Sequence, residues 1–233
     1  NNIMFNTPCA YGIMSTAGSI YAYNFSSNFP YATAGWMPEC VMTHGGHNHQ
    51  NLFEGNYVPT IWKDWIHGNS SYDLYARNRL TGYEPGKTGS TRPVNLEQNQ
   101  DYITVVGNVL GTAGYHTSYE DSGNTSIWNI NSDSAPTFLR KGNWNTVNQA
   151  IPTNEALGSD TVANSYVYSS KPAWFGDRPW PAYSPTSPAS ASPTSIPAGY
   201  RFYNGSFPSA GTTGGSAAPA PPVDVSILSV SQL

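Results

Sequence analysis

A short figure of strand-forming residues that closes on asparagine recurs along the first two-thirds of the chain. The clearest copy is the run Asn-Leu-Phe-Glu-Gly-Asn at residues 51–56, and successive closing asparagines are 18, 32, 22, 30 and 35 residues apart. Repeats of about 20 to 50 residues that hold one short strand and have no helical period are typical of a parallel β-helix. The closing residues are Asn6, Asn24, Asn56, Asn78, Asn108 and Asn143.

These asparagines predict a column along the stacked coils. Successive coils of such a solenoid lie about 4.8 Å apart. An asparagine at a coil corner tolerates the left-handed backbone conformation, and its amide can hydrogen-bond to the amides above and below it. We therefore expect Asn24, Asn56, Asn78 and Asn108 to stack. The alternative is that asparagine simply marks unrelated turns.

Alternation within these figures separates the two faces of each predicted strand. We place the smaller, aliphatic face inside, with Ile20, Leu52 and Leu74, because a parallel sheet in a coil turns one face inward. Glu54 belongs to this face, so it needs a buried partner. The aromatic face is then expected outside, as a substrate-binding strip formed by Tyr21, Tyr23, Phe53 and Tyr75.

The chain divides into four predicted parts. Residues 1–150 hold the coils, residues 151–183 form an aromatic and proline-rich cap that wraps them, and residues 184–195 are a Pro/Ser linker. Residues 196–233 are a short return and a mobile tail that leads toward a further domain. The chain opens on a coil figure at Asn2, so we expect upstream coils of the same polypeptide, or neighbouring subunits, to cover an otherwise unpaired edge.

Charge is scarce in this sequence. Only 10% of the residues are charged, the net charge is −4, and lysine and arginine form no run. Nucleic acid and anionic membranes are therefore poor partners, and no apolar run is long enough to span a bilayer. The many Gly, Pro, Tyr and Trp residues are typical of secreted β-proteins. Cys9 and Cys40 could form one disulfide in an oxidising compartment, a pairing that the sequence leaves open.

Several motifs together resemble the pectate-lyase-like superfamily of right-handed parallel β-helices, and more narrowly the C-terminal part of large secreted bacterial β-helix proteins. The resemblance covers roughly residues 1–183. It implies an all-β, right-handed parallel β-helix at an extracellular or cell-surface location, and polysaccharides that are cleaved by β-elimination or hydrolysis, or merely bound. The motifs are His44-Gly45-Gly46-His47, Asn51 to Asn56, Ile66-His67-Gly68, Arg77-Asn78, residues 107–111 and residues 169–177. The Trp-Ile-Asp-His run of pectate lyases does not occur in contiguous order at residues 61–67, so no lyase residue is carried over.

Elimination on an acidic polysaccharide needs a cation beside the uronate carboxylate, a base for the C5 proton and an acid for the leaving oxygen. The candidates close together in coil position are His44, Asp64, His67, Tyr72 and Arg77. Hydrolysis would need two carboxylates across a sugar bond, and the nearest are Glu54, Asp64 and Asp73. The alternative is that His44 and His67 are structural residues that satisfy backbone groups at the turns.

Metal binding has a separate pair of candidates. His47 and His49 project to the same side of an extended segment, and imidazoles suit Zn or Cu. The resemblance to the superfamily also leaves a Ca²⁺ site built from Asp and Asn oxygens possible, although this sequence has no dense cluster of aspartates and makes no cofactor certain. His116 could belong to the same column as His44 and His67.

Two functions follow from these observations. The first is a secreted β-helix protein that binds an extracellular polysaccharide and, if it is an enzyme, cleaves it by elimination rather than hydrolysis. The second is a structural or adhesive module of a fibre or cell-surface protein, with no catalysis, whose coils continue into neighbouring chains.

Overall fold

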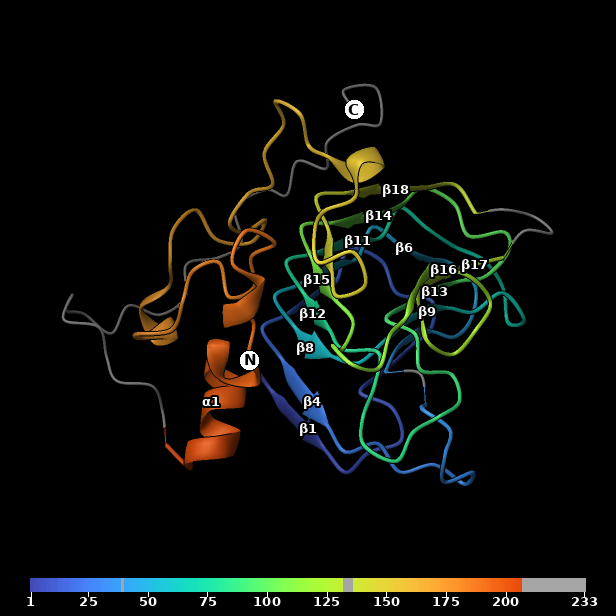
Figure 1. Cartoon of the computed structure of the whole chain (residues 1–233), viewed down its shortest axis with the longest axis horizontal. Helices are drawn as coiled ribbons and strands as arrows, with labels where there is room; N and C mark the ends of the chain where they lie inside the picture. The colour runs from blue at the N-terminus through green and yellow to red at the C-terminus, as the bar shows by residue number, and fades with distance from the viewer. Residues whose placement is uncertain (39, 132–135, 207–233) are drawn as a thin grey trace.

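The computed structural model describes residues 1–38, 40–131 and 136–206. Its strands are short and pair in parallel, in three main sheets and one small one (Figure 1). Sheet 1 consists of β1 (Ile3–Phe5), β4 (Phe25–Ser27), β8 (Tyr57–Val58), β12 (Arg79–Leu80), β15 (Val109–Leu110) and β19 (Trp144–Asn145). Sheet 2 consists of β2 (Tyr11–Ile13), β5 (Val41–Thr43), β9 (Ile61–Lys63), β13 (Val94–Leu96), β17 (Ser126–Ile130) and β16 (Ser118–Glu120). Sheet 3 consists of β3 (Ile20–Ala22), β7 (Leu52–Glu54), β11 (Leu74–Ala76), β14 (Ile103–Val106) and β18 (Phe138–Lys141), and the small sheet pairs β6 (Asn48–His49) with β10 (Ser70–Ser71).

The chain visits sheets 1, 2 and 3 in turn and then returns to sheet 1, and we call each such passage a coil. The first coil runs from β1 to β3, the second from β4 to β7, the third from β8 to β11, the fourth from β12 to β14 and the fifth from β15 to β18. The predominantly β, parallel architecture is therefore confirmed, and it is compatible with the predicted solenoid. Within the described ranges the one α-helix is α1 (Pro197–Asn204), and no helix there is long and apolar enough to cross a membrane.

The predicted asparagine column is present. Each side-chain amide donates from Nδ2 to the Oδ1 of the next asparagine: Asn24 to Asn56 at 2.9 Å, Asn56 to Asn78 at 3.0 Å, and Asn78 to Asn108 at 3.1 Å. The column ends on Asn143, which accepts from Asn108 at 2.9 Å. The coils therefore share one internal row of amides that joins segments 22 to 35 residues apart.

Two details of that prediction are wrong. Asn2, not Asn6, begins the column, because Ile3 pairs with Phe25 and so aligns Asn2 with Asn24. The residue with left-handed backbone is generally the one before the column asparagine, as at Gly55 (φ 63°) and Arg77 (φ 56°). The corner and the column are therefore two adjacent positions with separate requirements.

The assignment of the two faces is also wrong. Phe53 and Tyr75 are 1% and 0% exposed, and their parallel rings lie 4.6 Å apart inside the coils. Tyr21 stacks on Phe53 at 4.9 Å at the first coil. Strands spaced about 4.8 Å apart let flat rings in register stack without voids, so an aromatic column fills the interior well. The aliphatic set that includes Leu52 and Leu74 lines the outer face of sheet 3 instead.

Glu54 therefore points outward, yet it is fully buried, because residues 163–168 lie over it. The carboxylate accepts from the Ser165 hydroxyl at 2.5 Å, from the Tyr166 backbone N–H at 2.5 Å and from the Tyr23 hydroxyl. Burial raises the pKa of Glu54. Arg77 fastens the same segment by donating to the carbonyl oxygens of residues 162 and 163. Glu54 and Arg77 thus both hold the wrapping segment.

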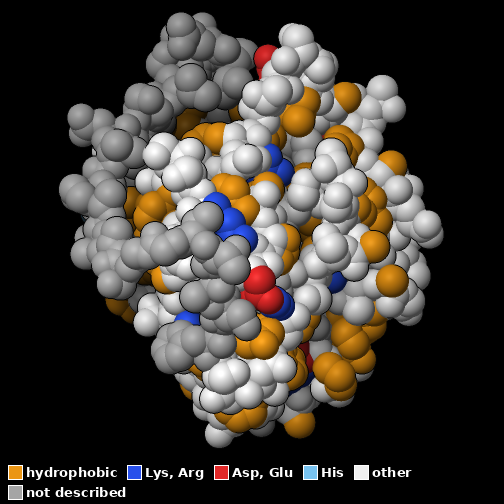
Figure 2. All heavy atoms as spheres, turned by 90° about the vertical axis from the view of Figure 1, so that its left-hand side faces the viewer, with side chains coloured by type: hydrophobic (Ala, Val, Ile, Leu, Met, Phe, Trp, Pro, Cys, Tyr) orange, Lys and Arg blue, Asp and Glu red, His pale blue; other side chains and the backbone are white. Residues whose placement is uncertain are grey.

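The C-terminal part covers the outer face of sheet 1 (Figure 1). Tyr23 and Phe25 pack there against Phe175, Tyr183 and Ile196. Residues 184–195, predicted to be a linker, contain the 3₁₀ turns η3 (Pro188–Ser190) and η4 (Pro193–Ser195), and η4 packs against α1. Two further 3₁₀ turns, η1 (Thr153–Glu155) and η2 (Ala173–Phe175), lie earlier in the wrapping segment. The mobile tail predicted after Ser209 falls within residues 207–233, which lie outside the described residues. Figure 2 shows the side of the molecule on which the C-terminal part covers sheet 1, and few charged side chains are visible there.

His116 is predicted to lie in one column with His44 and His67, and this prediction is wrong. His116 is buried beside sheet 2, where Nδ1 accepts from the Thr112 N–H at 2.9 Å and Nε2 lies 3.1 Å from the Thr91 carbonyl oxygen, to which it donates. Both ring nitrogens are thus satisfied by one neutral tautomer, and burial lowers the pKa of His116. An unfolded imidazole has a pKa of about 6.5.

The unfolding free energy should therefore fall as the pH drops below about 6.5, because the unfolded chain then binds a proton that the folded chain resists. His116→Gln removes this titration. Denaturant titrations at pH 7 and pH 5 should give a larger loss for the wild type than for the variant. Equal losses would show that His116 is not buried in its neutral form.

No disulfide bond links Cys9 and Cys40. The Cys40 thiol is buried, and burial raises its pKa, whereas Cys9 is half-buried. Alkylation requires thiolate, so iodoacetamide should modify Cys9 at least about tenfold faster than Cys40 in the native protein. Mass spectrometry after timed labelling checks this, with Cys9→Ser to isolate Cys40. Equal rates, or no labelling until a reductant is added, would contradict it.

Candidate active site

Three of the predicted catalytic residues meet at the turn that follows sheet 2. His67 Nδ1 lies 2.6 Å from Asp64 Oδ2, and His44 Nδ1 lies 2.7 Å from the same oxygen. The two imidazole ring centroids are 3.8 Å apart. The structure therefore brings together His44, Asp64 and His67, which we call the His–Asp–His cluster.

Strand register explains this meeting. Thr43 pairs with Lys63, so the residues that follow them, His44 and Asp64, are vertical neighbours in the second and third coils. His67 reaches back to Asp64 from three residues further along the same turn. Local sequence thus brings His67 to Asp64, whereas only the stacking of coils brings His44.

Asp64 is held firmly. Its Oδ1 accepts from the Ile66 backbone N–H at 2.8 Å, and its carbonyl oxygen accepts from Gln100 Nε2 at 2.9 Å. Gln100 is fully buried and accepts in turn from the Ser70 N–H at 3.0 Å. The carboxylate is thereby oriented with Oδ2 toward the two imidazoles.

Glu97 of the fourth coil occupies the position equivalent to His44 and Asp64 in the second and third coils. Leu96 pairs with Lys63, which places Glu97 beside Asp64 in register. Its Oε2 accepts from the Trp65 backbone N–H at 3.1 Å, and burial raises the pKa of Glu97. The sequence offered a signal for this residue, since a charged residue follows the strand in both the third and the fourth coil.

The predicted metal pair lies next to this cluster but is not part of it. His47 and His49 line a surface hollow together with His67, and His49 Nδ1 lies 2.9 Å from the His47 carbonyl oxygen. In the part of the chain that the structure describes, the His–Asp–His cluster is the one group of three or more His, Cys, Asp or Glu residues whose donor atoms lie close enough to hold an ion, all within 4.8 Å of one another. A metal bound by His47 and His49 alone remains a prediction.

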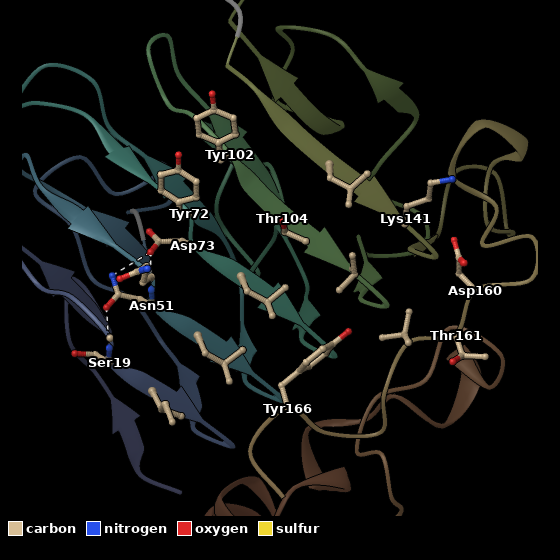
Figure 3. A pocket seen from close by; sticks show the side chains of 18 of the residues that line it. Ser19, Asn51, Tyr72, Asp73, Tyr102, Thr104, Lys141, Asp160, Thr161 and Tyr166 are labelled. Atoms are coloured by element: carbon tan, nitrogen blue, oxygen red, sulfur yellow. Dashed lines mark hydrogen bonds between the residues drawn. The ribbon is translucent and has the colours of Figure 1, made fainter. Parts of the chain in front are cut away.

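A groove of about 340 Å³ lies on the outer face of sheet 3. Its floor is a row of residues in register from the first coil to the fifth, namely Ile20, Leu52, Leu74, Thr104 and Leu139. Tyr72 and Tyr102 stand side by side at one side, and Lys141 and Asp160 lie across the groove from them (Figure 3). The two tyrosine rings stack 4.7 Å apart and are 47% and 43% exposed.

Tyr72 is thus a groove residue, and Arg77 lies away from the cluster, beneath the wrapping segment. The predicted substrate strip is wrong for Phe53 and Tyr75, which are core residues. Tyr23 is buried under the C-terminal part, and Tyr21 stacks on Phe53.

The carboxylates considered for hydrolysis are not brought together either. Glu54 is bound to the wrapping segment, and Asp73 forms an internal ion pair with Lys63 at 2.5 Å.

The chain matches no family model, no curated protein and no solved structure.

Proposed function

We propose that the chain is a right-handed parallel β-helix of the pectate-lyase-like type, secreted or held at the cell surface, that binds an extracellular polysaccharide. The direction of the groove supports this most. Its floor crosses all five coils, and five strands about 4.8 Å apart span about 19 Å. A linear polymer laid along it meets an equivalent position at every coil.

The chemistry of the groove is compatible with sugars. Ile20, Leu52 and Leu74 offer an aliphatic floor for the C–H faces of sugar rings, while the Tyr72 and Tyr102 rings stand at its side. A concave, mostly apolar site with a few polar groups at its rim is the usual form of a small-ligand site. Lys141 and Asp160 supply such polar groups at the side of the groove, and Thr104 adds a hydroxyl to its floor.

Replacing both groove tyrosines, Tyr72→Ala with Tyr102→Ala, should weaken polysaccharide binding by about tenfold or more, because two aromatic contacts are lost. Tyr31→Ala is the matched control, since Tyr31 is 48% exposed and does not line the groove. Affinity electrophoresis in gels that contain acidic or neutral polysaccharides measures both. Retention by no polymer, or equal retention of the double variant, would refute groove binding.

Elimination at the His–Asp–His cluster is the proposed reaction. Asp64 occupies His67 Nδ1, which leaves the other ring nitrogen of a half-exposed side chain to take a proton. A carboxylate that orients an imidazole in this way is a common general-base arrangement. Arg77 donates to the wrapping segment and not to this cluster. The cluster's own side chains therefore do not supply the cation that neutralises the uronate carboxylate.

Elimination on a uronate polymer creates a conjugated double bond whose absorbance in the ultraviolet can be followed. His67→Ala should lower the rate by about 10²- to 10⁴-fold, the usual contribution of a general base. His49→Ala is the control, because His49 lies in the adjoining hollow without contacting Asp64. Absence of product from every uronate polymer, or an unaltered rate in His67→Ala, would reject the lyase proposal and leave binding alone.

A structural or adhesive module is the second candidate. The first coil carries the exposed apolar side chains Ile3, Phe5, Met14 and Ile20, and β1, β2 and β3 lie at the edges of their sheets. Neighbouring subunits could cover this edge. Light scattering over a concentration series should then show association that Met14→Asp weakens, whereas monomers at high concentration would count against this candidate.

A further inference from the structure

We propose that His44, Asp64 and His67 form a binding site for a divalent transition-metal ion, with Zn²⁺ as the best match. Three donor atoms from two coils, His44 Nδ1, Asp64 Oδ2 and His67 Nδ1, converge at one point of the surface. This inference stands on the donors alone and does not depend on the polysaccharide proposal. An ion on His67 Nδ1 keeps the ring proton on the other nitrogen, so the general-base role of His67 belongs to the metal-free protein.

The His44 nitrogen carries the argument. His44 Nδ1 is buried and has no hydrogen-bond partner, although it lies 2.7 Å from Asp64 Oδ2. The carboxylate oxygen is close but lies in the wrong direction for a hydrogen bond, while the same oxygen does hydrogen-bond to His67. A buried polar atom without a partner is costly, and an ion placed between the three donors would satisfy it.

The donor atoms must move apart to admit an ion. Zinc binds nitrogen and carboxylate oxygen at about 2.0 to 2.2 Å. Ligands of a tetrahedral ion at these bond lengths lie about 3.3 to 3.6 Å from one another, compared with 2.6 and 2.7 Å for the two contacts to Asp64 Oδ2. The His44 and His67 side chains are 28% and 48% exposed, so we expect them to move outward by up to about 1 Å when the ion binds.

The surroundings also fit a metal site. Asp64 Oδ1 is already occupied by the Ile66 N–H, and Gln100 holds the Asp64 backbone, so Oδ2 remains for the ion. Such supporting hydrogen bonds orient metal ligands in proteins. The hollow lined by His47, His49 and Ser71 adjoins His67 on the solvent side.

The donor set selects the class of ion. Two imidazoles with one carboxylate suit zinc and related transition metals, whereas Ca²⁺ prefers six to eight oxygen ligands. Three protein ligands that face solvent leave a coordination position open, as in catalytic rather than closed structural sites. A bound ion would also bring positive charge to a hollow that has no lysine or arginine among its lining residues.

Isothermal titration of the metal-stripped full chain with ZnCl₂ tests this site. We expect one Zn²⁺ per chain, and Asp64→Asn, His44→Ala and His67→Ala should each weaken binding by at least about 100-fold, because each removes a direct ligand. The double variant His47→Ala with His49→Ala is the matched control and should stay within about threefold of the wild type. Circular dichroism verifies that each variant is folded.

Absence of zinc binding by the wild type would overturn the proposal, as would binding that survives loss of the cluster or disappears in the His47/His49 double variant. Co²⁺ gives a second measurement on the wild type alone, through visible absorption bands from nitrogen and oxygen coordination. No such bands would also overturn it. Neither experiment contains a saccharide, so their failure is distinct from failure of polysaccharide binding.

Discussion

Asn78→Ala is expected to lower the free energy of unfolding by about 3 to 5 kcal/mol, since each stranded buried polar group costs about 1 to 3 kcal/mol. The Asn78 side chain is buried and makes four hydrogen bonds. Its Oδ1 accepts from the N–H and Nδ2 of Asn56, and its Nδ2 donates to the Phe53 carbonyl oxygen and to Asn108 Oδ1. Alanine leaves the hydrogen-bonding groups of Asn56, Phe53 and Asn108 without their partner in the buried interior.

Asn148→Ala is the matched control for this column variant, because Asn148 is exposed. A surface substitution of this kind changes stability by at most about 0.5 kcal/mol. Urea unfolding followed by tryptophan fluorescence measures both variants. A loss for Asn78→Ala no greater than for Asn148→Ala would show that the amides do not form the column.

Lys63→Met should cost a similar amount, about 3 to 5 kcal/mol, because it removes one partner of a buried ion pair. Lys63 and Asp73 are both 0% exposed, and Lys63 Nζ lies 2.5 Å from Asp73 Oδ2 inside the coils. Asp73 Oδ1 accepts from the backbone N–H and Nδ2 of Asn51. The single variant thus leaves a carboxylate that is buried with only amide partners.

The double variant Lys63→Met with Asp73→Asn provides the control. Asparagine at position 73 keeps an oxygen for Asn51 and carries no charge, so the double variant should recover at least about half of the loss. The same urea titration gives the coupling between the two sites. Additive losses would mean that the two side chains do not meet in the interior.

The sequence predicts the coils well because their main signal is local. A strand followed by asparagine recurs in every coil, and the amide column forms wherever these asparagines occupy equivalent positions. The assignment of Asn6 to the column is wrong because residues 3–6 are also a short strand that ends on asparagine, like the segments that do lead into the column. A better signal is the strand that follows each column residue, as Ile3 follows Asn2 and Phe25 follows Asn24. That strand belongs to sheet 1 and fixes the register.

Inside and outside could not be separated from alternation alone. Both faces of sheet 3 are largely apolar, since the outer one forms the groove floor at Leu52 and Leu74. What buries Glu54 and Arg77 is a segment that comes more than 80 residues later. The candidate site shows the same limit: the contact of Asp64 with His67 is local, whereas that of His44 depends on the pairing of Thr43 with Lys63.

The central claim is that successive coils stack so that His44 lies against Asp64 and makes one site from two turns. A crystal structure of the zinc-soaked protein, with anomalous data at the zinc edge, tests it most directly. The account predicts one anomalous peak bounded by His44, Asp64 and His67, and, elsewhere in the same map, a continuous row of amides from Asn24 to Asn143. A map in which His44 and Asp64 lie in separate parts of the molecule would contradict it.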